Sequence, residues 1–234
     1  MSWLLTTYLY LFTLGWGVFF ARAVFNFRGV LSLEEMDITP TAARPRVSII
    51  IAACNEAATI AETLTNLLQQ DYPDFELIVV NDRSTDETGL ILKRFAEADA
   101  RIKSITLSTL PAGWLGKVHA LDQGLKQASG QWLLFTDADV QFAPDTLTRA
   151  VSVATDRQLD HLALFPRVLA ASSVLDTCIQ CFRVLFFESV NPRQVQDPDS
   201  NAAVGVGAFN LVKRATLEKT PGLQWLKLEV GDDV

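Results

Sequence analysis

The sequence predicts an α/β protein, built as a mainly parallel sheet with helices on both faces and preceded by one transmembrane helix. Three observations support this prediction. After residue 46, apolar runs of strand length alternate with segments of helical periodicity, as in α/β domains. Polar residues directly follow three of those runs, and the first twenty residues carry no charge. With 234 residues, the chain has room for one such domain and an anchor.

The N-terminal segment predicts a membrane anchor. Ser2–Phe20 is an uncharged run of nineteen residues, and about 20 apolar residues cross the hydrocarbon core of a bilayer. Arg22 and Arg28 follow this run, which favours a cytoplasmic location for the rest of the chain. We therefore assign residues 1–28 to the anchor and residues 29–46, which are polar and contain two prolines, to a linker.

A cleaved signal peptide is the alternative for the N-terminal segment. Ala21, Arg22 and Ala23 form a small-x-small pattern of the kind that signal peptidase cuts. However, no Lys or Arg precedes the apolar run, and the run exceeds the about 7 to 15 residues of a signal-peptide core. These two differences favour the anchor.

The alternation after residue 46 defines the predicted strands and helices. Val47–Ala53 is rich in β-branched residues, as expected for a strand that is buried on both faces. The segment after it repeats apolar residues at helical spacing, and the alternation then continues to Thr136. The predicted strands are Val47–Ala53, Phe75–Val80, Arg101–Leu107 and Trp132–Thr136, and the predicted helices are Glu56–Gln70, Thr85–Ala98 and Lys117–Ala128.

Polar side chains gather at the carboxyl ends of these strands. Asn55 and Glu56 follow the first strand, Asp82 follows the second, and the fourth is followed by Asp137 and Asp139. Ligands bind outside the carboxyl ends of the strands in a parallel α/β sheet, so these side chains should converge on one site. Capping of a helix or turn is the competing explanation for each residue alone. Together they predict an acidic pocket that accepts a diphosphate only with a divalent cation.

Two features of this pocket specify its chemistry. Asp137 and Asp139 end a buried strand, and two carboxylates can share a hard cation such as Mg²⁺ or Mn²⁺ with the oxygens of a diphosphate. Such a cation neutralises charge on a leaving nucleotide diphosphate. Lys117 closes a loop that contains Gly113 and Gly116 and precedes a helix, and this arrangement favours an anion.

Several classes of protein are disfavoured. The formal net charge is −7 without a basic tract, which argues against nucleic-acid binding. The chain has no GxxxxGK[ST] loop for ATP and no GxGxxG after its first strand for a nicotinamide cofactor. Cys178 and Cys181 form a single CxxC that lacks the further ligands of a zinc site. We interpret them as two small apolar residues on one helix.

The segment Val174–Val190 has two interpretations. It is apolar over much of its circumference, but Asp176, Arg183 and Glu188 make it too charged to span a membrane. A helix that packs into the core is favoured, because its apolar side chains need burial. An amphipathic helix that lies in the membrane interface is the alternative.

Five motifs occur in order along the chain: VSIIIAACNEAATI, ELIVVNDRSTDET, GWLGKVHALDQGLKQASG, WLLFTDADV and GAFNLVKRATLE, and GDDV ends it. This series resembles the family 2 glycosyltransferases, particularly bacterial membrane-associated members of hopanoid and carotenoid clusters. The resemblance covers residues 47–234, which we assign to a catalytic domain. It implies the A-type glycosyltransferase fold, which is Rossmann-like, and transfer of a hexosyl group from a nucleotide-diphosphate sugar with Mg²⁺ or Mn²⁺.

The resemblance also implies roles for individual residues. The family's acidic pair falls on Asp232 and Asp233, where spacing alone leaves an acidic turn equally open. Asp233 is the expected base that takes the proton of the acceptor hydroxyl in an inverting transfer, with Asp232 as the second catalytic candidate. Metal binding falls on Asp139, and donor binding falls on Ala52, Asn55, Glu56, Asp82, Lys117 and Asp137.

The sequence departs from the family pattern at three places. Many members have a proline near position 52, where this chain has Ala52 and Ala53, and the acidic pair usually begins with Glu rather than Asp232. The chain ends directly after this pair, whereas relatives continue with an acceptor-side helix and further membrane helices. The sequence therefore predicts that the C-terminal part of the catalytic domain is missing.

The expected partners follow from the resemblance. A UDP-sugar donor is favoured over a GDP-sugar, the acceptor is a lipid or a glycan, and the location is the inner (cytoplasmic) membrane with the catalytic domain in the cytoplasm. A sugar nucleotidyltransferase is one alternative, although the loop at Cys54, Asn55 and Glu56 is acidic rather than basic and glycine-rich. A catalytically incomplete membrane protein that only binds nucleotide-sugar is the other.

Overall fold

The computed structural model describes residues 2–38, 44–197 and 199–228, and the chain divides into two compact units. The first unit combines Met1–Met36 with Arg167–Val204, and the second combines Asp37–Pro166 with Gly205–Val234. A segment from the middle of the predicted catalytic domain thus belongs to the same unit as the N-terminal helix. The predicted domain boundaries at residues 28 and 46 stay predictions.

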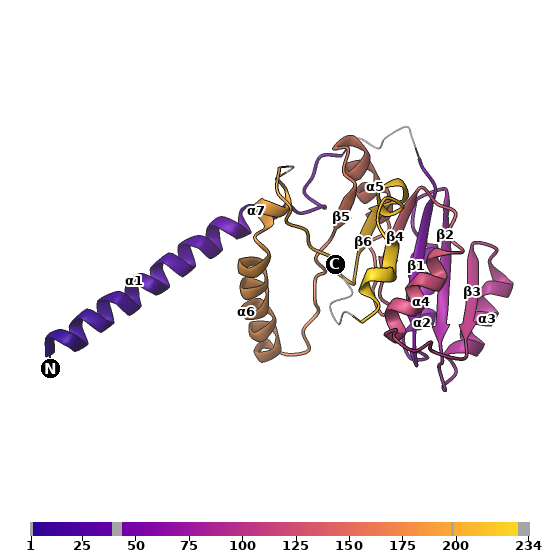
Figure 1. Cartoon of the computed structure of the whole chain (residues 1–234), viewed down its shortest axis with the longest axis horizontal. Coiled ribbons are helices and arrows are strands. Elements are labelled where there is room, and N and C mark those ends of the chain that lie inside the picture. Colours follow the sequence, from indigo (N-terminus) through magenta and orange to yellow (C-terminus); the bar gives the residue numbers. More distant parts are fainter. Residues whose placement is uncertain (1, 39–43, 198, 229–234) are drawn as a thin grey trace. The chain divides into compact units, whose positions relative to one another are not determined.

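The second unit is built on a six-stranded sheet with the order β3-β2-β1-β4-β6-β5 (Figure 1). The first four strands along the chain are mutually parallel, β6 is antiparallel to β4, and β5 is antiparallel to β6. The mainly parallel α/β sheet predicted from the sequence is therefore confirmed. The strands are β1 (Val47–Ala53), β2 (Phe75–Asp82), β3 (Ile102–Leu107), β4 (Trp132–Thr136), β5 (His161–Ala163) and β6 (Asn210–Lys213).

Helices connect or follow the strands of this sheet. The helix predicted from Thr85 begins at Thr88, and the one predicted from Glu56 begins at Ile60, because the backbone amide of Glu56 donates to Thr88 Oγ1 and Asn55 has a positive φ of 59°. Both features hold the residues after β1 in a turn. The helices are α2 (Ile60–Leu68), α3 (Thr88–Ala98), α4 (Gly116–Leu125), α5 (Thr146–Asp156), α8 (Arg214–Leu217) and the 3₁₀ helix η1 (Gly222–Leu226).

Both faces of the sheet are covered. Ile50 and Ile78 belong to a buried cluster with Val118 of α4 and with Leu223 and Leu226 of η1. Ile49, Ile51 and Leu77, which alternate with these strand residues, are also fully buried. Alternate side chains of a strand point to opposite faces, so burial of both sets explains the continuous β-branched run of β1.

The first unit contains α1 (Ser2–Phe27), α6 (Ser173–Val190) and the short α7 (Pro192–Val195). Trp3–Phe27 contains an 18-residue window with a mean hydropathy of 1.5, and it is the one described helix that is long and apolar enough to cross a membrane. The sequence favoured a helix at Val174–Val190 that packs into the core, and this prediction is wrong. Phe187 is the one buried residue of α6, because only the C-terminal end of α6 meets a neighbouring helix.

Candidate active site

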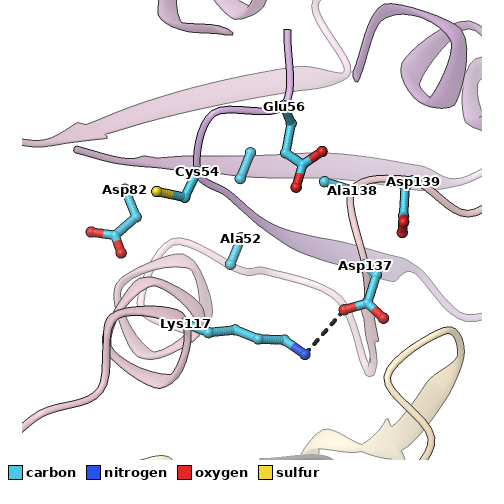
Figure 2. A pocket seen from close by; sticks show the side chains of 9 residues that line it. Ala52, Cys54, Glu56, Asp82, Lys117, Asp137, Ala138 and Asp139 are labelled. Carbon is cyan, nitrogen blue, oxygen red and sulfur yellow. Dashed lines mark ion pairs between the residues drawn. The ribbon is translucent and has the colours of Figure 1, made fainter. Parts of the chain in front are cut away.

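A pocket of about 340 Å³ opens at the carboxyl ends of β1, β2 and β4 (Figure 2). The chain winds from β1 through β2 to β3 and then returns to place β4 on the other side of β1. The pocket therefore lies at the topological switch point, where ligands of open α/β sheets bind. Its lining residues are Ala52, Ala53, Cys54, Glu56, Asp82, Lys117, Asp137, Ala138 and Asp139.

Lys117 and Asp137 form an ion pair inside the pocket. The ammonium Nζ of Lys117, from the first turn of α4, lies 3.0 Å from Asp137 Oδ1 (Figure 2). The Asp137 backbone is held by a 3.1 Å hydrogen bond from its amide to the carbonyl of Gly207. Both side chains are more than a third exposed, so a ligand can reach them. Lys117 supplies positive charge beside an otherwise acidic strand end.

Asp82 is buried at the edge of the pocket and is already paired. Its side chain is 4% exposed and accepts two hydrogen bonds from Arg83, at 2.7 Å to Oδ1 and 2.8 Å to Oδ2. The hydrogen bond to Asp82 raises the pKa of Arg83. A Cβ atom on Gly116 would lie 2.6 Å from Asp82 Oδ2. A side chain at position 116 would clash with Asp82, so Gly116 allows α4 to begin beside the Asp82–Arg83 pair. This role is separate from any contact with phosphate.

Asn55 and Glu56 take different positions in the turn after β1. Asn55 is not among the residues that line the pocket, and its Oδ1 accepts a 2.8 Å hydrogen bond from the amide of Thr85. Glu56 does line the pocket, and its carboxylate accepts a 3.0 Å hydrogen bond from the hydroxyl of Thr59. Asn55 thus ties the loops after β1 and β2 together. The predicted role of Asn55 in donor binding stays a prediction.

Asp139 is the exposed carboxylate of the loop after β4. The loop that carries it is fixed by a 2.8 Å hydrogen bond from the Thr63 hydroxyl to the carbonyl of Ala138. Within residues 2–38, 44–197 and 199–228, no group of three or more His, Cys, Asp or Glu side chains is arranged to hold a metal ion. Asp137 and Asp139 are the two carboxylates that this loop presents at the pocket.

Two further observations complete the site. Ala53, Cys54 and Ala138 line the pocket although the sequence did not nominate them. Their signal was their position, because Ala53 ends β1 and Cys54 and Ala138 lie in the loops that carry the predicted residues. Asp232 and Asp233 lie outside the described residues.

The segment that leads to this acidic pair is fastened to α4. The amide of Leu115 donates a 2.7 Å hydrogen bond to the carbonyl of Lys227, and the Lys227 ammonium lies 4.7 Å from the ring centroid of Trp114. In addition, Gln224 Nε2 donates a 2.9 Å hydrogen bond to Asp122 Oδ1 of α4. The end of η1 is therefore held beside the loop that precedes Lys117.

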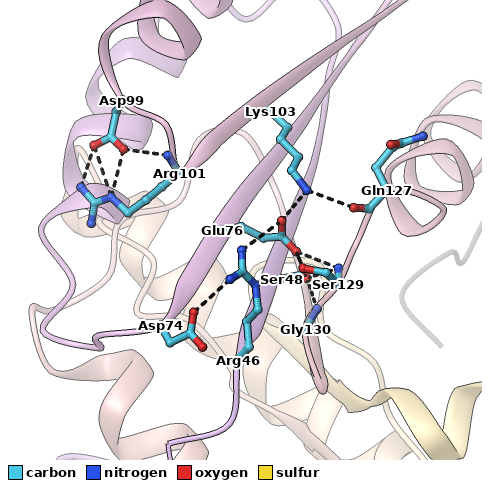
Figure 3. Close-up of polar contacts among 10 residues, drawn as sticks. All are labelled: Arg46, Ser48, Asp74, Glu76, Asp99, Arg101, Lys103, Gln127, Ser129 and Gly130. Carbon is cyan, nitrogen blue, oxygen red and sulfur yellow. Dashed lines mark hydrogen bonds and ion pairs between the residues drawn. The ribbon is translucent and has the colours of Figure 1, made fainter.

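The amino ends of the same strands carry a second acidic group, Glu76 (Figure 3). Its side chain is 1% exposed, and the ammonium of Lys103 lies 2.7 Å from Oε2. Oε1 accepts hydrogen bonds at 2.7 Å from the Ser48 hydroxyl and from both the amide and the hydroxyl of Ser129. Burial alone would raise the pKa of Glu76, but the bonds from Lys103, Ser129 and Ser48 outweigh it and lower the pKa to about 2.

Close packing accompanies the bonds around Glu76. Gly130 follows Ser129, and its amide donates a 2.8 Å hydrogen bond to the Ser48 hydroxyl. A Cβ atom on Gly130 would lie 2.5 Å from the backbone nitrogen of Ser48. Glycine is therefore required at the turn that enters β4.

Comparison with solved structures places the fold. A mannosyltransferase of Pyrobaculum calidifontis, solved with GDP-Man and Mn²⁺, is 27% identical with a TM-score of 0.65, covering 88% of this chain and 55% of that one. A structure of TarS from Staphylococcus aureus with UDP is 23% identical with a TM-score of 0.55, covering 80% of this chain and 53% of that one. The second likeness supports the fold alone.

Sequence comparison identifies the family. A beta-monoglucosyldiacylglycerol synthase of Nostoc is 33% identical over 145 residues, which are 58% of this chain and 31% of that protein. A poly-beta-1,6-N-acetyl-D-glucosamine synthase of Staphylococcus epidermidis is 33% identical over 131 residues, covering 55% and 30%. The chain thus spans about a third of the length of these relatives. Because the model of glycosyl transferase family 2 matches residues 48–219, the chain belongs to that family of glycosyltransferases and has their A-type fold.

Proposed function

We propose that this glycosyltransferase moves a hexosyl group from a nucleotide-diphosphate sugar to a lipid or polysaccharide acceptor, with inversion and with Mg²⁺ or Mn²⁺. One observation carries the proposal: the switch-point pocket combines acidic side chains from the ends of three strands with the ammonium of Lys117. A diphosphate needs positive charge in such surroundings, and both a lysine and a shared cation can supply it.

The donor is proposed to lie along the carboxyl ends of β1, β2 and β4. Ala52, Glu56 and the buried Asp82 are assigned to the nucleoside, and Lys117 to the diphosphate, because the helix that Lys117 opens favours anions at its N-terminus. Asp137 is assigned to the ribose or base. A UDP-sugar is our first choice of donor and a GDP-sugar our second, which the mannosyltransferase solved with GDP-Man supports.

The pocket fits a hard divalent cation that is shared with the substrate. Mg²⁺ in proteins is commonly held by one or two carboxylates together with substrate phosphates and water, so a third protein carboxylate is not required. Asp139, which is exposed at the pocket, would hold the ion, with Asp137 beside it. When bound, the ion neutralises charge on the leaving diphosphate.

The base is proposed to be Asp233, with Asp232 as its alternative. A carboxylate that accepts the proton of the acceptor hydroxyl makes this oxygen a better nucleophile for the anomeric carbon. The contacts of Lys227 with Leu115 and Trp114 support this assignment. Asp233 is six residues beyond Lys227. An extended chain of that length reaches at most about 20 Å, and Leu115 is two residues from Lys117 in the pocket.

The acceptor and the location are proposed together. The relative named as a beta-monoglucosyldiacylglycerol synthase supports a lipid acceptor, and the one named as a poly-beta-1,6-N-acetyl-D-glucosamine synthase supports a polysaccharide. The apolar α1 supports anchoring in the inner (cytoplasmic) membrane. Arg22 and Arg28 at its C-terminal end support a cytoplasmic catalytic domain.

Calorimetric titration of the full chain in detergent tests the donor site, using UDP and then GDP, each with and without Mn²⁺. We expect binding of one nucleotide that requires Mn²⁺, that is lost in Asp139→Ala and that is kept in Glu97→Ala. Glu97 is a suitable control because its side chain is exposed on α3. Failure of folded protein to bind either nucleotide, or metal-independent binding that survives Asp139→Ala, would overturn the proposal.

A turnover assay separates transfer from the two alternatives. Release of UDP or GDP from a nucleotide-sugar in the presence of membrane lipid is the expected result. Release of pyrophosphate from a nucleoside triphosphate would instead identify a sugar nucleotidyltransferase. Donor binding without release of either product would identify a protein that only binds nucleotide-sugar.

A further inference from the structure

One face of α6 is apolar and open to the surroundings. The exposed side chains Val174, Leu175, Phe182 and Leu185 have exposed fractions of 76%, 46%, 59% and 60%. Cys178 and Cys181 are also exposed, and both are free thiols. With about 100° between successive residues of a helix, these six positions fall within an arc of about 120°. Together they form one continuous apolar strip along the helix, which we term the α6 strip.

The opposite side of α6 is polar and bonded within itself. Gln180 Nε2 donates a 3.2 Å hydrogen bond to Asp176 Oδ1, and Arg183 donates a 3.0 Å hydrogen bond to Gln180 Oε1. Asp176, Gln180 and Arg183 therefore lie on the side of α6 opposite the α6 strip, whereas Glu188 lies near the edge of the strip at the end of α6 that meets α1. Such a division is typical of a helix that lies between an apolar and an aqueous phase.

The C-terminal end of α6 is joined to α1. Glu188 accepts a 2.9 Å hydrogen bond from Asn26 Nδ2 and forms an ion pair of 3.3 Å with Arg22. The rings of Phe27 and Phe187 meet edge to face with their centroids 5.2 Å apart. These contacts cover Phe187 and Glu188 and leave the α6 strip open. They also fix α6 at the end of α1 where the chain would leave a bilayer.

A bilayer is the occupant that best fits the α6 strip. Contiguous exposed apolar patches are uncommon on soluble surfaces and mark contacts with a protein or a membrane. None of the 18-residue window that qualifies α1 as a candidate span is buried, so α1 presents its apolar surface along that window. Because α6 is joined to the end of α1, a bilayer that holds α1 would lie next to α6. Asp176, Arg183 and Glu188 give α6 no positive excess, so apolar insertion rather than charge would drive the contact.

We propose that α6 lies in the surface of the bilayer with the α6 strip inserted among the lipid chains, as a second membrane contact beside α1. This proposal rests on the proposed membrane location of α1. It places the α6 strip in contact with lipid close to the headgroups. The expected depth is about 5–10 Å below the headgroup boundary.

The native cysteines provide the test in the full chain. The protein is reconstituted into phosphatidylcholine vesicles, and an environment-sensitive fluorophore is placed on one cysteine at a time in a background without the others. The three sites are Cys178 on the α6 strip, Gln180→Cys on the polar side as the matched control, and Leu9→Cys within α1. Quenching by lipids with a nitroxide near the headgroup is compared with quenching by lipids that carry it deep in the chain.

The proposal expects Cys178 to be quenched more strongly by the shallow nitroxide than by the deep one. Gln180→Cys should be quenched by neither, and replacement of part of the phosphatidylcholine by anionic lipid should not change either result. Leu9→Cys should be quenched by the deep nitroxide, which reports separately on α1.

Three results would overturn the proposal. Quenching of Leu9→Cys without quenching of Cys178 would refute the bilayer contact of α6 and leave the location of α1 intact. No quenching at any site would refute both. The fluorophore on Cys178 could instead report an apolar environment that depends on the protein concentration and is not quenched by nitroxide lipid. That result would identify a second copy of the chain as the occupant of the α6 strip.

Discussion

The two ends of the parallel sheet use acidic residues in opposite ways. At the amino ends, the Glu76 carboxylate is buried and surrounded by donors from Lys103, Ser48 and Ser129 (Figure 3). At the carboxyl ends, Asp139 is exposed and has no hydrogen bond or ion pair with the residues that the structure describes. A carboxylate whose bonds are complete stabilises the fold, whereas one with open oxygens can take a ligand.

Asp82 and Asp137 lie between these extremes. Asp82, whose side chain is 4% exposed, is nearly as buried as Glu76 and is bonded by its neighbour Arg83, whereas Asp137 is 37% exposed and has an ion pair with Lys117. The extent to which a carboxylate is already paired by other side chains therefore rises from the mouth of the pocket toward the sheet. It gives an order in which substitutions should shift from affecting activity to affecting stability.

The largest effect is expected from Asp139→Asn. Removal of one group that stabilises developing charge lowers turnover by about 100- to 1,000-fold, and we expect a loss of this size. Because Asp139 is exposed, the thermal midpoint should stay the same or rise. Initial rates of nucleotide release and thermal melts of the same preparations measure the two quantities. A fall in the thermal midpoint together with the loss of turnover would show that the two ends of the sheet do not differ as described.

Glu76→Gln should have the reverse effect. Lys103 is about half exposed, so its charge is not left buried by this change, but the amide loses hydrogen bonds to a charged group that are worth about 1.5–3 kcal/mol each and faces the donors of Ser48 and Ser129. We expect the free energy of unfolding to fall by about 3 kcal/mol in denaturant titrations. Donor affinity of the molecules that stay folded should not change, and a selective loss of affinity would contradict the structural role.

The pH dependence of stability should also report on Glu76. Its pKa is about 2 in the folded chain and lies near 4.5 in the absence of its partners. A lowered pKa contributes stability above the unfolded value, and this contribution is lost as the pH falls toward 2. The difference in unfolding free energy between the parent chain and Glu76→Gln should therefore be constant above about pH 5 and shrink below about pH 4.5. A difference that is independent of pH in this range would refute the lowered pKa.

The smallest effect separates two lysines at opposite ends of the sheet. Lys117→Met removes a partly exposed ion pair, so stability should change by less than about 1 kcal/mol. Lys103→Met leaves the buried Glu76 without its ammonium partner, and a hydrogen bond to a charged group is worth about 1.5–3 kcal/mol. Only Lys117→Met should weaken nucleotide binding. Each 1.4 kcal/mol of binding free energy that is lost raises the dissociation constant about tenfold. Titration calorimetry and denaturant unfolding of both variants measure this contrast.

The sequence was sufficient to predict the four parallel strands. The β-branched runs of β1 and β2 are buried on both faces, so their composition alone identifies them. It was not sufficient for β5 and β6, which have three and four residues and pair only with partners distant in the chain. Such short segments carry no period, and their pairing depends on the sheet already formed by the other strands.

Topology alone explains why several predicted residues converge on one pocket, whereas local geometry decides which way a side chain in a turn points. Strand ends fix the positions of Glu56, Asp137 and Asp139, so the switch-point rule places them in one pocket. The rule cannot give the direction of a side chain within a turn, and Asn55 points to Thr85 as a result of its positive φ. Burial of α6 was predicted wrongly because periodicity shows that a face is apolar and not what covers it.

The pairing of β5 with β6 has a consequence for how the protein can be altered. Ala163 pairs with Asn210, and the amide of Leu164 donates a 3.1 Å hydrogen bond to the carbonyl of Phe209. The stretch between them, which includes α6, therefore begins and ends at neighbouring positions of the sheet that are hydrogen-bonded to each other. Each doubling of such a loop costs only about 0.6 kcal/mol of closure entropy. The part of this stretch that belongs to the first unit, residues 167–204, can thus be shortened, lengthened or exchanged while Gly207, which holds the backbone of Asp137, and the strands that line the pocket stay in place.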